Sequence, residues 1–300
     1  MNYLTSKKIP ANILYNLISN IFIAIIFFFT LPIYSNYMDA INFKLYCFFY
    51  SSVFFFKFLE IGASPTIIRY ISKKILLENW LDAVRNFIYF YELVFLFLTS
   101  ILFFLLFFFR DLISMNLLNV ESLDTVGMSP PSFDSISAIK FVLYIFSFIM
   151  LFKLLAVLYR GVLYGFEMQK YFNITRVIFE FLTLFIGIQI IIIFNFNSFL
   201  YLYFWILFTA VLETAIYKFV IIKKINVKIN LSLKKGFMIF IANSNFMLNI
   251  ALSSFLWIVA SNIDKLLFAS YLNSISYGIY IMVTSFSILP LLLIVPIFES

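Results

Sequence analysis

Long, unbroken apolar segments are the feature that most constrains how this chain folds. Eight segments consist almost entirely of apolar side chains; they are residues 11–34, 41–59, 84–109, 136–159, 174–194, 199–222, 237–261 and 275–298. A helix of about 20 residues spans the hydrocarbon core of a bilayer. Unbroken segments of this length favour helices over the short alternating strands of a membrane barrel. We therefore predict an all-α polytopic membrane protein with about eight transmembrane helices.

Composition supports this fold class and excludes several functions. Hydrophobic residues make up 64% of the chain and charged residues 12%, whereas soluble domains carry about 25% charged residues. The chain has no histidine and one cysteine, Cys47. An internal disulfide framework and a thiolate metal site are therefore excluded, and the commonest general base is absent. We expect no metal, no cofactor and no enzymatic activity.

The basic residues gather on alternate connections between the apolar segments. One side holds Lys7, Lys8, Arg69, Lys73, Lys74, Arg85, Lys153, Arg160, Lys170, Arg176, Lys218, Lys223, Lys224, Lys228, Lys234 and Lys235. The other side holds Lys44, Arg110, Lys140 and Lys265. By the positive-inside rule the first side is cytoplasmic. We predict a multi-pass protein of the cytoplasmic (inner) membrane with its N-terminus inside, and read the net charge of +7 as this orientation signal rather than as nucleic-acid binding.

A basic linker divides the chain into two unequal parts. We expect residues 1–222 to form a first six-helix lobe, 223–236 a cytoplasmic linker, and 237–300 the first two helices of a second, incomplete lobe. Residues 37–46 align without gaps to 271–280, and the trio Asn12, Asn16, Asn20 resembles the trio Asn245, Asn249, Ser253. Spacing of four places each trio on one helical face. The likeness indicates a parallel repeat about an axis along the membrane normal; chance similarity in an Asn-rich chain is the alternative.

Three short motifs lie at the ends of predicted spans. They are Glu60-Ile61-Gly62-Ala63-Ser64-Pro65 with Arg69-Tyr70; Arg160-Gly161 with Tyr164-Gly165-Phe166 and Gln169-Lys170; and Asn262, Asp264 and Lys265 with Tyr277-Gly278-Ile279-Tyr280. These motifs resemble those of the polysaccharide repeat-unit flippases, within the multidrug, oligosaccharidyl-lipid and polysaccharide exporter superfamily. The family usually has Asp where this chain has Glu60.

The resemblance implies two helical lobes around a cavity. It also implies translocation of undecaprenyl-diphosphate-linked oligosaccharides from the inner to the outer leaflet, for O-antigen and other surface polysaccharides. The implied partners are the lipid-linked oligosaccharide, the lipid bilayer and the polysaccharide polymerase machinery, with no nucleic acid.

A diphosphate substrate requires cationic partners within the membrane protein. The candidates are Lys57 and Lys153 inside predicted spans, and Arg69, Arg160 and Arg176 at cytoplasmic helix ends. Long basic side chains at helix ends also anchor in the headgroup region. Both interpretations stay open for these five residues.

Other polar residues within or near the spans form a second set of candidates. Glu92, Glu180 and Glu213 lie inside predicted spans, where acids mark ion pathways or pair with a cation such as Lys57, Lys153 or Arg176. Asp264 and Lys265, at the outer end of the seventh span, are either an external gate pair or a solvated pair. The two Asn trios either bind sugar hydroxyls or hydrogen-bond a neighbouring helix.

Two other function classes compete with a flippase. A cation-coupled multidrug antiporter of the same superfamily would have a smaller cavity with acids and few cations. A membrane polysaccharide polymerase or glycosyltransferase would need a large external loop or an acidic pair in the first outer loop. Residues 35–40 form a short loop with one acid, Asp39, and the chain has no Gly-rich phosphate loop.

Overall fold

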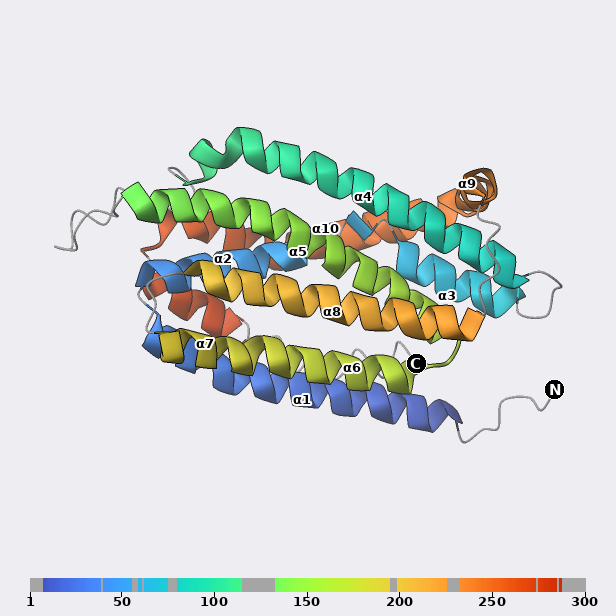
Figure 1. The fold of residues 1–300 in the computed structure, drawn as a ribbon, viewed down its shortest axis with the longest axis horizontal. Helices are drawn as coiled ribbons and strands as arrows, with labels where there is room; N and C mark the ends of the chain where they lie inside the picture. The colour runs from blue at the N-terminus through green and yellow to red at the C-terminus, as the bar shows by residue number, and fades with distance from the viewer. Residues whose placement is uncertain are drawn as a thin grey trace.

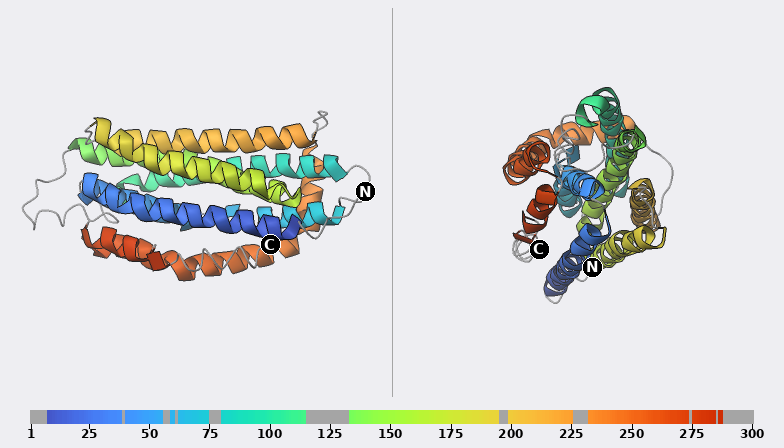
Figure 2. Two further views of the ribbon diagram at one scale, coloured as in Figure 1. Left: turned by 90° about the horizontal axis from the view of Figure 1, so that it is seen from below. Right: turned by 90° about the vertical axis from the view of Figure 1, so that its left-hand side faces the viewer.

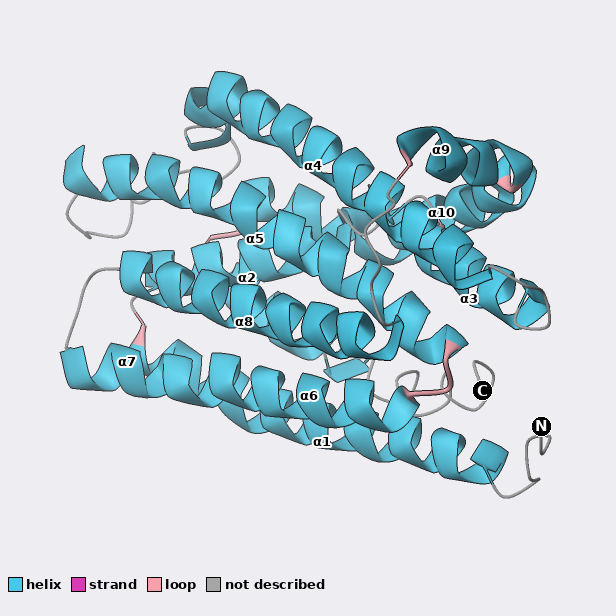
Figure 3. Cartoon of the chain, turned by 45° about the vertical axis from the view of Figure 1, so that its right-hand side comes forward, coloured by secondary structure: helices cyan, strands magenta, loops and turns pink. Residues whose placement is uncertain are grey.

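The protein is a bundle of helices along one long axis (Figure 1). The computed structural model describes residues 8–38, 40–55, 59–60, 62–74, 80–114, 133–194, 199–225, 232–273, 275–284 and 286–287. The helices are α1 (Lys8–Tyr37), α2 (Ala40–Phe55), α3 (Ala63–Lys74), α4 (Trp80–Leu112), α5 (Phe133–Gly165), α6 (Gln169–Phe181), the π-helix η4 (Leu182–Ile186), α7 (Gly187–Phe194), α8 (Phe199–Ile225), α9 (Leu233–Ala242) and α10 (Ser244–Tyr271). A further short helix covers Ile275–Thr284. Figure 3 shows helices joined by loops and no strand in the part of the chain that is described.

Six helices are long and apolar enough to cross a membrane. They cover Leu14–Tyr37, Leu81–Leu112, Ile139–Gly165, Gln169–Ile193, Leu200–Lys223 and Ser244–Tyr271. We call the end where α1 begins and α5 ends the basic end, and the end where α1 ends and α2 begins the opposite end (Figure 1). These helices confirm the predicted all-α polytopic membrane fold.

The second predicted span, 41–59, corresponds to α2 and is followed by a further helix, α3. α2 and α3 follow one another along the bundle, so that together they cover most of its length (Figure 1). Between them Gly62 adopts φ +64°, a left-handed conformation that glycine accepts without steric cost. The Glu60 carboxylate caps α3, accepting the Ser64 backbone N–H at 3.0 Å. The expected single helix over 41–59 therefore continues as α3, and the Glu60 motif lies inside the bundle rather than at its end.

The seventh predicted span also differs from the structure. Residues expected in one helix over 237–261 belong partly to α9 and partly to α10, which meet at Asn243. α9 crosses the basic end of the bundle (Figure 2, left). It packs on α4, where a Cβ on Gly236 would lie 2.5 Å from the carbonyl oxygen of Asn86. The Asn86 side chain accepts the Ser232 backbone N–H at 2.7 Å, just before α9 begins.

Two apolar cores hold the bundle together. One, toward the opposite end, gathers residues of α1, α2, α5 and α8 such as Leu31, Leu45 and Val142. The other, toward the basic end, gathers residues of α3, α4 and α5 such as Ile67 and Tyr91. Gly161 and Gly165 let α3 approach α5, since a Cβ on Gly161 would lie 2.7 Å from the Ile67 side chain. Met150 belongs to the first core and Leu154 to the second, and polar side chains gather where the two cores meet.

Candidate functional site

A polar cavity lies where the two cores meet. Its volume is about 130 Å³, and it is lined by α2, α5, α6, α8 and the segment that precedes α3. The lining residues are Val53, Glu60, Met150, Lys153, Leu154, Ala156, Val157, Arg160, Phe172, Arg176, Glu180 and Glu213. Three cationic and three acidic side chains thus share one cavity inside an apolar bundle. Since charges inside a membrane protein are expensive, such a cluster is a candidate functional site.

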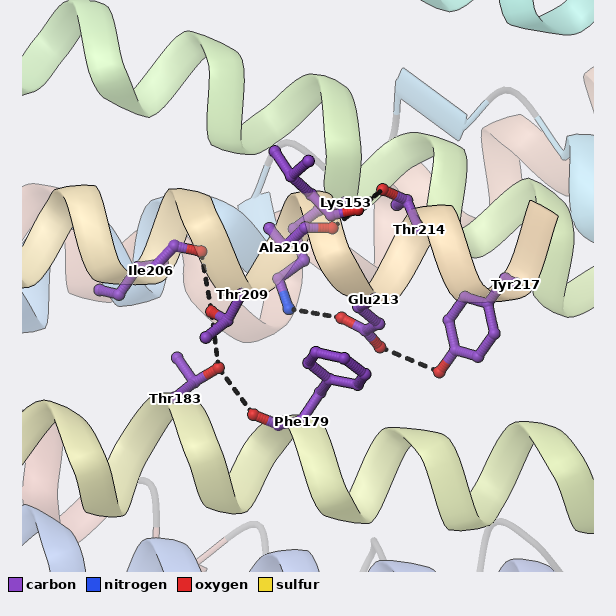
Figure 4. Close-up of polar contacts among 10 residues, drawn as sticks. Lys153, Phe179, Thr183, Ile206, Thr209, Ala210, Glu213, Thr214 and Tyr217 are labelled. Carbon is purple, nitrogen blue, oxygen red and sulfur yellow. Dashed lines mark hydrogen bonds and ion pairs between the residues drawn. The ribbon is translucent and has the colours of Figure 1, made fainter. Parts of the chain in front are cut away.

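One ion pair bridges α5 and α8 at the cavity. The Lys153 ammonium lies 3.4 Å from Glu213 Oε2, and the Glu213 side chain is 9% exposed. The other carboxylate oxygen accepts the Tyr217 hydroxyl at 3.0 Å (Figure 4). Glu213 is therefore satisfied by a cation and a hydroxyl, as a buried carboxylate requires. Of the two predicted roles, ion pairing describes this geometry, and the pair also gives Lys153 an acidic partner.

The two arginines of the cavity are less constrained. Arg160 makes neither an ion pair nor a hydrogen bond with the rest of the described chain. Arg176 donates from Nη1 to the Asn20 side chain at 2.9 Å. Since a guanidinium has five N–H donors, both arginines keep donors for an anion. Glu180 lines the same cavity.

Polar side chains of α1 and α6 form a ladder between the two helices. Asn173 donates to Asn16 Oδ1 at 2.5 Å, and Asn16 donates to Gln169 Oε1 at 3.1 Å. Ser19 donates to Asn173 Oδ1 at 3.0 Å. Asn16 is 4% exposed, so this Asn face of α1 makes a helix contact, with Asn20 at its cavity end. Asn12, half-buried, lies one turn nearer the start of α1.

The corresponding face of α10 has a different environment. Asn245, Asn249 and Ser253 are exposed. The Ser253 hydroxyl donates to the Asn249 carbonyl within α10 at 2.9 Å. The side chains of Asn245 and Asn249 make no hydrogen bond to any residue that the structure describes. The two faces are therefore in separate environments here.

Two of the other candidates lie outside the cavity, and a third falls on a residue that is not described. Arg69 on α3 is exposed, and its guanidinium lies 4.1 Å from the centroid of the Phe246 ring on α10. Glu92 on α4 lies 3.1 Å from the Lys218 ammonium and accepts the Tyr159 hydroxyl at 2.5 Å. Its cation is thus Lys218 and not one of those expected. Lys57 lies outside the described residues.

Asp264 and Lys265 point to different partners although they are neighbours in the sequence. Lys265 is 6% exposed and donates to the Asn262 side chain at 2.8 Å. Asp264 accepts the hydroxyl of Tyr280 from the following helix. Within the described ranges no ion pair joins Asp264 to Lys265. The two residues, for which an external gate pair and a solvated pair were both expected, therefore make separate contacts here.

A π-helical turn follows Glu180 and was not predicted. Side chains from other helices donate hydrogen bonds to two main-chain carbonyl groups of η4. Trp205 Nε1 donates to the Leu182 carbonyl at 3.1 Å, and the Tyr34 hydroxyl to the Leu184 carbonyl at 3.0 Å. Thr183 donates to Thr209 on α8 at 2.9 Å (Figure 4). This turn fixes α6 against α8 directly beside the cavity.

Sequence analysis also missed several residues that build the site. Glu60 appeared in a motif but not among the candidates, and Gln169, Asn173 and Tyr217 were not recognised as partners. One signal was present: Gln169, Asn173 and Arg176 have helical spacing and therefore share a face. Among the described residues no group of three or more His, Cys, Asp or Glu side chains is arranged to hold a metal ion.

The spans and the charged cavity define a polytopic α-helical membrane protein with a polar site enclosed in its bundle. The family model of polysaccharide biosynthesis proteins matches residues 9–300, and the chain belongs to this family. The match confirms the predicted family and supports a role in polysaccharide biosynthesis or export. Comparison with curated proteins and with solved structures gave no significant match.

Proposed function

We propose that this protein translocates undecaprenyl-diphosphate-linked oligosaccharides across the cytoplasmic membrane by alternating access, as a transporter and not an enzyme. The observation that carries the proposal is the cavity in which Lys153, Arg160 and Arg176 come together. Arginine recognises phosphate oxygens through two parallel N–H bonds. The family match, to polysaccharide biosynthesis proteins, supports the choice of a polysaccharide intermediate as the substrate.

The cavity residues also suggest how binding is coupled to a change of conformation. Arg160 has no partner among the described residues and is available to an entering diphosphate. Lys153 has a partner, Glu213 at 3.4 Å, and must leave it to join the phosphate. A ligand shifts a conformational equilibrium only by binding the two states differently. Exchange of Lys153 between Glu213 and the diphosphate provides such a difference.

Translocation requires a polar path and no covalent step. Bare polar groups in hydrocarbon cost several kcal/mol each, and the charged cavity offers partners for the head group. The exposed apolar faces of α4 and α8, with residues such as Phe108 and Phe219, would contact lipid. In this proposal the basic end faces the cytoplasm, where the substrate is made.

Reconstitution into proteoliposomes tests the proposal. A fluorescent undecaprenyl-diphosphate-linked disaccharide is supplied, and the fraction in each leaflet is measured with a membrane-impermeant quencher. We expect wild-type protein to accelerate exchange and Arg160→Ala to slow it at least about tenfold, since a hydrogen bond to a charged group contributes about 1.5–3 kcal/mol. Arg69→Ala, a matched exposed arginine outside the cavity, should stay within about twofold of wild type.

Two results would contradict the proposal. Wild-type protein that leaves the leaflet distribution unchanged would exclude this substrate. Arg160→Ala protein as active as wild type would show that transport does not depend on the cavity. Uptake of a hydrophobic cation driven by a proton or sodium gradient, with no movement of the lipid-linked disaccharide, would instead identify a multidrug antiporter.

A further inference from the structure

A buried lysine closes the end of the bundle remote from Arg160. Lys44 on α2 is 3% exposed, and its ammonium donates to the carbonyl of Leu272 at 3.0 Å. Leu272 is the C-cap residue directly after the last residue of α10, Tyr271. The carbonyl groups at a helix C-terminus carry partial negative charge and lack intrahelical partners. Lys44 therefore caps α10 from another helix.

The two segments joined by Lys44 are the ones that resemble each other in sequence. α1 ends at Tyr37 and α10 ends at Tyr271, which are aligned residues of the proposed repeat. The Met38 N–H donates to the Tyr34 carbonyl at 3.0 Å, and the aligned Leu272 N–H donates to the Phe268 carbonyl at 2.9 Å. A short turn and a second helix follow in both. We call them the first hairpin (α1 and α2) and the second hairpin (α10 and Ile275–Thr284).

The hairpins meet closely at the position that Lys44 and Gly278 share in the alignment. A Cβ on Gly278 would lie 2.4 Å from the ring of Phe43, the residue before Lys44. The ring of Phe28 on α1 and that of Phe286, two residues beyond the second hairpin, have centroids 4.8 Å apart. Figure 2 (right) looks onto this end and shows the two hairpins side by side. A lysine in one hairpin and a glycine at the matching place in the other thus build one contact.

We infer that Lys44 closes this end of the transport pathway by capping the C-terminus of α10, and that the two hairpins separate here when the pathway opens at this end. The inference rests on the proposed function. The long side chain of Lys44 provides the attractive contact, and Gly278, which has no side chain, leaves room for the Phe43 ring. Loss of the ammonium leaves the α10 carbonyl without its cap and weakens the closed state.

The native cysteine reports on this contact without any transport assay. Cys47 is the single cysteine of the chain, is 0% exposed, and shares a core with Tyr277 of the second hairpin. The protein in lipid nanodiscs is treated with a water-soluble, membrane-impermeant maleimide, and the labelling rate is measured. We expect Lys44→Met to accelerate labelling about tenfold or more, which corresponds to the net contribution of one charge-assisted hydrogen bond. Lys140→Met, a half-exposed lysine at the same end paired with Asp111 at 2.6 Å, should label as slowly as wild type.

A cross-link distinguishes separation of the hairpins from local unfolding of α2. Phe28→Cys and Phe286→Cys are added to Lys44→Met and joined by a short thiol-specific cross-linker, which leaves Cys47 as the free thiol. If the hairpins separate, the cross-link restores slow labelling. Labelling that stays fast after cross-linking overturns the inference, and so does Lys44→Met protein that labels as slowly as wild type. Because the labelling assay uses no substrate, the inference about Lys44 can fail while the transport proposal stands, and the transport proposal can fail while the inference stands.

Discussion

Helices α1 and α10 carry the same polar pattern in opposite environments. On α1, Asn16 is 4% exposed and bonds to Gln169 and Asn173 of α6. On α10, Asn249 is exposed and its side chain has no hydrogen-bond partner among the described residues. Spacing of four determines which residues share a face, whereas the environment of that face depends on the helix that lies beside it. α6 presents a complementary row of polar residues to α1, and the described neighbours of α10 pack on its other side.

The difference has an energetic consequence. Within an apolar bundle a satisfied polar network stabilises a helix pair, and a partly satisfied one destabilises it. The ladder between α1 and α6 belongs to the first kind. The buried side of α10 contributes mainly apolar contacts at its start, such as Met247, and polar ones nearer its end, where Lys265 bonds to Asn262.

Removal of Asn16 should give the largest loss of stability. Asn16→Ala leaves the buried Asn173 amide without one of its partners, at about 1–3 kcal/mol, and also removes the hydrogen bond to the half-buried Gln169. We expect a free-energy loss of about 2–4 kcal/mol and a melting temperature lower by about 5 °C or more. The measurement is thermal unfolding of the purified protein in detergent. Asn245→Ala on α10 is the matched control and should change stability by about 0.5 kcal/mol or less. Equal losses in both variants would remove the distinction between the two helices.

The sequence predicted most of the fold because long apolar segments report directly on helices that cross a membrane. It placed the end of the second span at residue 59, but it did not predict that the chain continues along the bundle as a further helix, α3. The break between α2 and α3 depends on Gly62 at φ +64° and on Glu60 as a cap, which are local features that a hydropathy pattern does not record. The division between α9 and α10 at Asn243 was missed for the same reason.

The sequence indicated which charged residues line the cavity, but it did not indicate which residues they pair with. Lys153, Arg160, Arg176, Glu180 and Glu213 were all candidates, because charges within apolar segments stand out. Their partners depend on which helices are neighbours and on the rotation of each helix, and neither is recorded in one sequence. Glu92 illustrates this point: it lies inside a span as expected, yet its cation is Lys218, from a helix end.

An intermediate effect is expected where the ladder reaches the cavity. Asn20 accepts a hydrogen bond from Arg176 at 2.9 Å, so Asn20→Ala frees the guanidinium to adopt other positions. We expect the translocation rate in proteoliposomes to fall about threefold to tenfold, because the hydrogen bond that orients Arg176 contributes about 1 kcal/mol. The melting temperature should change little. Ser253→Ala, at the aligned position of α10, should leave both quantities unchanged. A melting temperature as low as that of Asn16→Ala would show that Asn20 acts through stability instead.

The smallest effect is expected for Asn249→Leu. The described structure gives the Asn249 side chain no hydrogen bond to lose, and leucine is the more favourable residue on a face that contacts lipid. Leu248 and Leu252 on the same helix are already 61% and 59% exposed. We therefore expect a melting temperature equal to or slightly above that of wild type, with an unchanged translocation rate. A clear loss of stability would mean that another helix covers this face. The Asn faces of α1 and α10 would then differ in the helices that they contact, and not in whether they are buried. A selective loss of translocation, with stability intact, would place Asn249 in the path of the head group.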